Sequence, residues 1–158
     1  MKLGCIAIVL AIGVVGCTSQ PFATPPVQTR EQREAQIDVA FQSVKGGRFD
    51  SAEKLLAPYM YRDKNSELRF RSLGVSSDAK KKAVDTVALM LWDTGRDGTL
   101  ESFAKRYLGG YERDVMLCRL AERNAVYEKA YNCWNELGDV DRARRTVRTE
   151  SALRILKD

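Results

Sequence analysis

The chain has 158 residues, a length typical of a single domain, and its charged and hydrophobic residues make up 30% and 44% of the composition. The formal net charge of +5 comes from 26 basic residues mixed with 21 acidic ones, whereas nucleic-acid-binding proteins more often carry a stripe of one sign, so no nucleic-acid partner is expected. Histidine, the commonest metal ligand and the usual general base near neutral pH, does not occur in the sequence. We therefore expect no metal, no cofactor and no enzyme activity.

The first 16 residues have the pattern of a secretion signal. A short basic start precedes an uncharged run over residues 3–15, which is shorter than the roughly 20 residues of a membrane-spanning helix. The run ends in Val14-Val15-Gly16-Cys17, which resembles the lipobox of bacterial lipoproteins. The resemblance implies cleavage before Cys17 and acylation of that residue by chains such as palmitate, and several acyl chains anchor a protein firmly to a membrane. The alternatives are an ordinary signal peptide and an uncleaved anchor.

The residues after Cys17 indicate where such a lipoprotein goes. Position 18 is Thr, rather than the Asp that tends to retain lipoproteins in the inner membrane of Gram-negative cells. By this resemblance the expected location is the outer membrane, on the periplasmic side. Residues 17–29 are rich in Pro, Ser and Thr, which predicts an extended lipidated tether. A helical domain is expected over residues 30–158.

Apolar periodicity predicts an all-α fold for that domain. Ile37, Phe41 and Val44 form one stripe of a helix over residues 30–46. The polar segment 61–77 is ambiguous, and a short helix over Ser66–Leu73 is one interpretation. The other predicted helices are one from about Asp50 to Pro58, one over 78–94 capped by Ser76 or Ser77, one starting at a Thr99 cap and ending near Leu108, and three over 111–123, 126–137 and 139–156. The helix over 78–94 is apolar on most sides, so we expect it at the centre of the core.

Two short segments echo one another. "GRFDSA" at 47–52 and "GDVDRA" at 138–143 share Gly, an apolar residue, Asp and Ala at equal offsets. Both resemble the turn and second-helix start of a tetratricopeptide repeat, although their separation is not a multiple of the 34-residue period of that family. The resemblance gives the turn, packing and close-approach roles to Gly47, Phe49 and Ala52, again to Gly138, Val140 and Ala143, and an aromatic position of a first helix to Trp134. The expected architecture is a set of antiparallel helical hairpins, either a tetratricopeptide-like α-solenoid or an unrelated small bundle.

Cys118 and Cys133 are the thiols left after processing, in a compartment that oxidises thiols. They lie nearly equidistant from a predicted turn at 124–126, so two antiparallel helices would bring them face to face, and we predict a disulfide. The alternative is a pair of small buried apolar side chains. Neither a CxxC spacing nor a Cys-His pair is present, which argues against a redox or nucleophilic site.

One dipeptide invites a catalytic interpretation. Glu101-Ser102 resembles the catalytic Glu-Ser pair of lytic transglycosylases, but the Gly-Leu-Met-Gln segment that follows in that family is missing. Glu101 also falls in the first turn of a predicted helix, where an acid complements the helix dipole. We favour the capping role for it.

The last predicted helix carries the candidate partner-binding residues. Its polar side holds Arg142, Arg144, Arg145 and Arg148, which could face an acidic protein or anionic lipid headgroups, or could be an ordinary solvated face. Val140, Ala143 and Val147 form one apolar stripe, and Leu153 and Leu156 fall roughly on the opposite side, where exposure would indicate a partner contact. Lys80-Lys81-Lys82 forms a second basic cluster.

These observations favour a non-enzymatic lipoprotein that binds another envelope protein and helps to assemble a machine of the secretion, pilus or conjugation type. The alternative is an exclusion or immunity lipoprotein of a mobile element. An enzyme of peptidoglycan turnover is the less favoured third hypothesis.

Overall fold

The structure, a computed structural model, describes residues 28–155, except for the side chains of Ala152, Leu153 and Ile155. Within this range the chain forms α1 (Arg30–Lys45), α2 (Phe49–Leu56), the 3-10 helix η1 (Ala57–Tyr59), β1 (Met60–Arg62), β2 (Leu68–Phe70), α3 (Ser77–Asp93), α4 (Asp97–Tyr107), α5 (Gly110–Arg123), α6 (Tyr127–Glu136) and α7 (Val140–Ile155). The predicted all-α class is confirmed. None of the helices between residues 28 and 155 combines the length and the apolarity needed to cross a bilayer.

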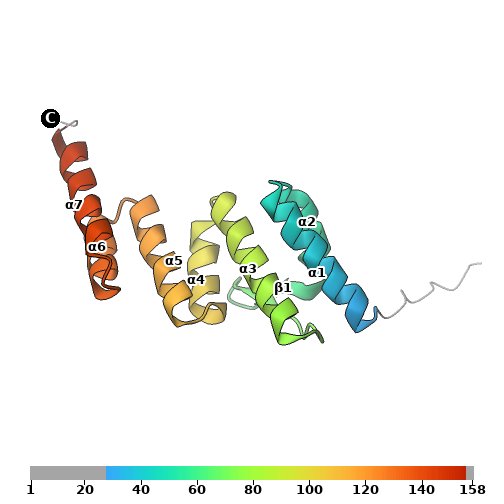
Figure 1. The fold of residues 1–158 in the computed structure, drawn as a ribbon. Coiled ribbons are helices and arrows are strands. Elements are labelled where there is room, and N and C mark those ends of the chain that lie inside the picture. The colour runs from blue at the N-terminus through green and yellow to red at the C-terminus, as the bar shows by residue number, and fades with distance from the viewer. Residues whose placement is uncertain (1–27, 156–158) are drawn as a thin grey trace, which may run out of the picture.

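The helices follow one another in an open row from α1 and α2 at one end to α6 and α7 at the other (Figure 1). α1 and α2, α3 and α4, and α5 and α6 form three successive hairpins, and α7 packs on α6. α1 contacts α3, while α4 contacts α5, so most of the packing joins neighbours in the row. This nearest-neighbour packing is the geometry of an α-solenoid rather than of a bundle around one core.

The turns within the hairpins and the turn between α6 and α7 share one backbone conformation. In each turn, a residue with positive φ follows the end of the preceding helix. These residues are Gly47 (70°), Gly95 (68°), Ala125 (56°) and Gly138 (77°). The next residue donates its N–H to a carbonyl five positions earlier, at 2.8 Å for Arg48 to Ser43 and 2.9 Å for Asp139 to Trp134, with equivalent bonds in the other two turns. This is the Schellman motif, which satisfies carbonyl groups at a helix end.

A small or apolar residue is buried five positions after each turn residue. Ala52, Leu100 and Ala130 are fully buried, and Ala143 is 1% exposed. The sequence echo therefore identified two copies of a turn that occurs four times. The spacing of the echo is irregular because Gly47 lies inside the first hairpin, whereas Gly138 joins the last hairpin to α7.

The possible helix over Ser66–Leu73 is wrong. The segment belongs to a β-hairpin in which β2 pairs antiparallel with β1, with Met60 opposite Phe70. Asp63 closes the turn, because its Oδ1 accepts the backbone N–H groups of Asn65 at 2.9 Å and Glu67 at 3.1 Å. Phe70 then packs edge-on against Phe103, with ring centres 5.9 Å apart. This contact with α4 favours a strand, and it is not visible in the local sequence.

α3 lies at the centre of the larger core, as predicted. Its buried residues include Ala83, Val87, Met90 and Leu91, each at most 1% exposed. Ser76 caps the helix by accepting the N–H of Ala79 at 3.3 Å, one of the two caps expected.

The expected cap at Thr99 is wrong. α4 begins at Asp97, and Thr99 lies within the first turn of the helix. The helix begins three residues earlier than predicted, because the backbone N–H of Arg96, its N-cap residue, already bonds to Leu91 in the Schellman arrangement.

Candidate functional site

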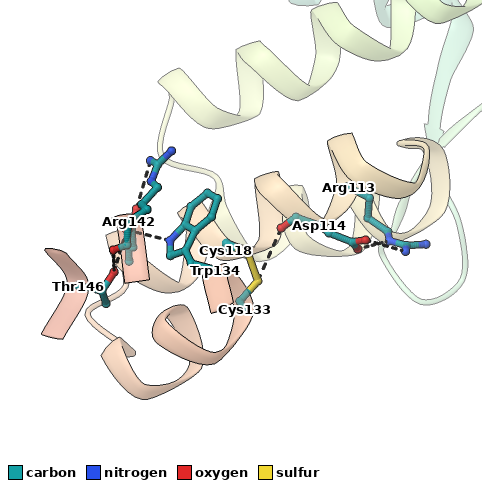
Figure 2. Close-up of a disulfide and its surroundings, with 8 residues drawn as sticks. Arg113, Asp114, Cys118, Cys133, Trp134, Arg142 and Thr146 are labelled. Atoms are coloured by element: carbon teal, nitrogen blue, oxygen red, sulfur yellow. Dashed lines mark hydrogen bonds and ion pairs between the residues drawn. A yellow bond between two sulfur atoms is a disulfide. The ribbon is translucent and has the colours of Figure 1, made fainter. Parts of the chain in front are cut away.

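A disulfide joins the two helices of the last hairpin, as predicted. Cys118 on α5 and Cys133 on α6 are bonded, with their Cα atoms 5.4 Å apart (Figure 2). Cys118 is fully buried and Cys133 is half-buried. Together with Trp134 and Ala143 they form a second, smaller core that lies apart from the core around α3. The C-terminal part of the row thus has few buried side chains, and a disulfide cross-links two of its helices.

Glu122 ties α5 to α6 and α7 beside this disulfide. Its Oε1 accepts hydrogen bonds from Nε1 of Trp134 at 2.9 Å and from Oγ1 of Thr146 at 3.1 Å. Its Oε2 pairs with Arg142 at 3.4 Å, and the guanidinium of Arg142 lies over the Trp134 ring (Figure 2). Glu122 comes from α5, Trp134 from α6, and Arg142 and Thr146 from α7, so polar as well as apolar contacts fix the relative position of the three helices.

The predicted arginine face of α7 divides into two parts. Arg142 is half-buried in the contact with Trp134, whereas Arg144, Arg145 and Arg148 are exposed. Arg144 comes within 4.0 Å of Asp141, a weak surface pair. One of the four arginines therefore has a structural role, and three remain available on the surface.

The predicted apolar stripe of α7 is wrong in two of its three residues. Ala143 is buried, but Val140 and Val147 are 45% and 43% exposed. Thr146 is 3% exposed and takes a place on the buried face, because its hydroxyl reaches Glu122 and the carbonyl of Arg142 at 3.0 Å. A polar residue can occupy this position only because its hydrogen bonds are satisfied.

A basic groove runs along α5 and α7. It consists of two adjoining recesses of about 460 Å³ and 360 Å³, which share Glu122 and Arg142. Glu122 is the single carboxylate among the lining side chains, and the groove is formed by Trp92, Arg119, Glu122, Arg123, Tyr127, Arg142, Arg145, Thr146 and Thr149. The sequence analysis missed Arg119, Arg123 and Trp92 as members of this surface, because they lie on helices other than α7.

Two of the groove arginines are committed to the fold and two are not. Arg123 lies 4.2 Å from the Trp92 ring centre, donates to the Trp92 carbonyl at 2.6 and 2.8 Å, and pairs with Asp97 at 3.2 Å. Arg142 is held by Glu122. Arg119 and Arg145 are exposed, and neither makes a side-chain hydrogen bond or ion pair within residues 28–155. The groove therefore carries positive charge that the described part of the chain does not neutralise.

A larger recess of about 680 Å³ lies on another side of the same hairpin, next to Cys133. It combines apolar residues such as Leu117 and Leu137 with three carboxylates and one cation, namely Asp114, Glu128, Glu136 and Lys129. Arg113 pairs with Asp114 at 2.8 Å. Carboxylates therefore outnumber cations in the lining, which does not favour an anionic ligand.

Glu101 and Ser102 form ordinary structural contacts. Lys105 donates to Glu101 at 2.8 Å, and this hydrogen bond lowers the pKa of the Glu101 carboxyl. Ser102 donates its hydroxyl to the carbonyl of Thr99 at 3.0 Å. A general acid at neutral pH needs a raised pKa, so the environment of Glu101 does not favour the transglycosylase interpretation.

The lysines of the second basic cluster differ in their contacts. Lys81 bridges Asp85 at 3.0 Å and Glu112 at 3.1 Å, and Lys82 pairs with Asp38. The pairs with Glu112 and Asp38 join α3 to α5 and to α1 at the surface.

Among the residues that the structure describes, no group of three or more His, Cys, Asp or Glu side chains is arranged to hold a metal ion.

Three of the predicted site residues cannot be placed. Cys17 and Leu156 lie outside the described residues, and so does the side chain of Leu153.

Comparison with known protein families, curated sequences and solved structures finds no significant match to the chain. The assignment of a function therefore depends on the residues themselves.

Proposed function

We propose that the protein is a lipid-anchored adaptor of the bacterial envelope. In this proposal Cys17 is acylated, the chain is held at the periplasmic side of the outer membrane, and the helical row binds another envelope protein during assembly of a secretion, pilus or conjugation machine. The proposed role is to hold a partner near the membrane rather than to transform a substrate.

The observation that carries the proposal is the Cys118–Cys133 disulfide across the last hairpin. Disulfides persist in oxidising compartments such as the periplasm and are rare in the cytosol. The signal-like start and the lipobox resemblance point independently to the same compartment. The disulfide and the signal-like start agree, and together they support the proposed location in the envelope.

The open row of hairpins supports the adaptor role. Each hairpin packs mainly on its neighbours, which leaves long faces of several helices at the surface. The groove along α5 and α7 gives one such face a defined shape and charge. Extended helical surfaces of this kind serve protein recognition in many unrelated proteins, and this part of the proposal is an analogy of fold.

The proposed lipid anchor and location are tested by replacing Cys17 with Ser in the full chain. The wild-type chain is expected in the outer-membrane fraction, carrying an alkyne-palmitate label and a mature mass that starts at Cys17. The variant should lose the label and remain unprocessed. Labelling that persists in Cys17→Ser would contradict the proposed anchor.

The adaptor role is tested by photo-crosslinking in intact cells. A photoreactive residue is placed at Tyr127, which lines the groove, and a control is placed at Lys64 in the distant β-hairpin turn. The proposal predicts one specific envelope-protein adduct from the first site only. Its absence at every surface position tested along the row would contradict the adaptor role.

A further inference from the structure

The groove along α5 and α7 combines recessed shape with unneutralised positive charge. Four arginines and one glutamate line its two recesses. Glu122 is already occupied by Trp134, Thr146 and Arg142, so it cannot neutralise a further cation. Arg119 and Arg145 are left with all of their guanidinium donors free for a ligand within the part of the chain that the structure describes. Fork-shaped guanidinium groups bind carboxylates through two parallel hydrogen bonds.

The arrangement also offers apolar contact beside the charge. Trp92 and Tyr127 contribute aromatic surface to the two recesses, and both side chains are half-buried. Arg123 holds one side of the groove in place through its contacts with Trp92 and Asp97. Arg142 is fixed by Trp134 and Glu122, so the floor of the groove is preorganised. A preorganised surface loses less conformational entropy when a ligand binds.

We propose that this groove binds an acidic peptide segment of a protein partner, with carboxylates of the segment on Arg119 and Arg145 and an apolar side chain against Trp92 or Tyr127. The inference deepens the adaptor function proposed above and rests on it, since it names the surface and the chemistry of the partner. It keeps Arg145 from the arginine face predicted on α7, adds Arg119 from α5, and leaves out Arg144 and Arg148, which line neither recess.

The shape of the site favours a peptide over a lipid surface. The recesses are concave and their walls come from α3, α5, α6 and α7. A flat bilayer could reach the exposed arginines but would leave the two recesses beside them unfilled. A peptide side chain can enter recesses of a few hundred Å³, the size range of ligand pockets.

The test uses the full mature chain in dodecyl maltoside micelles and a fluorescein-labelled peptide of alternating Glu and Phe. A peptide in which Lys replaces every Glu serves as the ligand control. Fluorescence anisotropy should show saturable binding of the acidic peptide only, and the affinity should fall as salt rises because exposed charges are screened. Absence of saturable binding, or equal binding of the basic peptide, would overturn the inference.

Two double variants locate the binding surface. Arg119→Glu/Arg145→Glu reverses the two free groove charges, and Arg144→Glu/Arg148→Glu makes the same charge change on the outer face of α7. The first variant should bind the acidic peptide at least about tenfold more weakly, and the second within about threefold of wild type. Equal losses in both would show a non-specific charge effect and would overturn the inference. Neither Arg119 nor Arg145 makes a side-chain hydrogen bond or ion pair in the described residues, and Arg144 makes only the weak surface pair with Asp141, so both variants should unfold within a few degrees of wild type.

A third arm separates a headgroup ligand from a peptide ligand. Phosphatidylglycerol added to the micelles should displace the acidic peptide no better than phosphatidylcholine does. Displacement that requires Arg119 and Arg145 would assign the groove to anionic lipid and would overturn the peptide proposal. If peptide binding fails while crosslinking in cells still captures one envelope protein, the acidic-peptide chemistry proposed for the groove fails and the adaptor function stands. If peptide binding succeeds while Cys17→Ser keeps its label, the proposed lipid anchor is contradicted and the groove inference stands.

Discussion

The guanidinium carbon of Arg142 lies 4.1 Å from the ring centre of Trp134, and the same guanidinium pairs with Glu122, which accepts the indole N–H. Three side chains from α5, α6 and α7 thus form one closed set of contacts. The set lies beside the disulfide, where few apolar side chains are buried. Its contribution to stability should therefore be measurable.

Replacing Arg142 with Ala should lower the free energy of unfolding by about 1–2 kcal/mol. The change removes a cation–π contact and leaves the half-buried Glu122 without its cation. Arg144→Ala, on the exposed face of the same helix, is the matched control and should change the value by less than about 0.5 kcal/mol. Urea unfolding measures both, and equal effects would show that the contact with Trp134 contributes little.

Replacing both Cys118 and Cys133 with Ala should lower the free energy of unfolding by about 3 kcal/mol. The bond closes a loop with a sequence separation of 15 and restricts the unfolded chain. Urea unfolding with and without reductant measures the effect, and the double variant should not respond to reductant. Alkylation of native protein without reductant should leave the peptides that contain Cys118 and Cys133 unmodified; modification of both would contradict the disulfide.

Stability should fall in acid through the loss of one contact between α1 and α3. The backbone N–H of Ser76 donates to Glu34 at 2.8 Å and Arg30 donates at 2.9 Å, and these hydrogen bonds lower the pKa of Glu34 to about 2. Because the folded pKa lies below the ordinary glutamate value of 4.5, the carboxylate stabilises the fold above about pH 4.5. That stabilisation disappears as the pH falls from about 4.5 to about 2.

The variant Glu34→Gln tests this assignment, because the amide can still accept from Ser76 but does not titrate. The difference in urea midpoint between wild type and variant should be larger at pH 7 than at pH 2. Glu31→Gln, in the first turn of α1, provides a comparison, because hydrogen bonds at the start of α1 itself lower the pKa of the Glu31 carboxyl. A difference between wild type and Glu34→Gln that does not change with pH would show that Glu34 is not responsible.

The repeated turn allows a reciprocal pair of substitutions. Ala125 has φ 56° and Gly138 has φ 77°, in turns with the same hydrogen bonds. Left-handed backbone is unfavourable for a residue with a Cβ, so Ala125→Gly should raise the free energy of unfolding by about 0.5 kcal/mol and Gly138→Ala should lower it by about 1 kcal/mol. A Cβ at Gly138 would have no atom within 4 Å, so the effect at that site comes from the backbone alone. Thermal unfolding of the two variants should give shifts of opposite sign.

Local patterns predicted most of the helices. The apolar stripe of α1, the Ser cap of α3 and the glycine-containing turns gave helix positions within a few residues of those observed. The disulfide was also predicted, because two cysteines at nearly equal distances from a turn lie at the same level of two antiparallel helices and can face one another. Each of these features depends on residues that are close in sequence, so a local rule can recognise it.

The errors arose where a distant residue decides the conformation. The segment with Leu68 and Phe70 became a strand because Phe70 packs on α4. Val147 lies outward and Thr146 inward because Glu122 on α5 accepts the Thr146 hydroxyl. Neither partner can be identified from the local sequence.

The sequence by itself determined the helical class, the turn positions and the pairing of the cysteines, because periodicity, glycine conformation and short-range spacing are properties of neighbouring residues. Tertiary structure alone decided that Arg142 belongs to an internal contact and that Arg119 and Arg145 share a groove. The physical reason is that charge neutralisation depends on which side chains meet across helices. An arginine on one helix is free or paired according to the carboxylates that other helices bring to it.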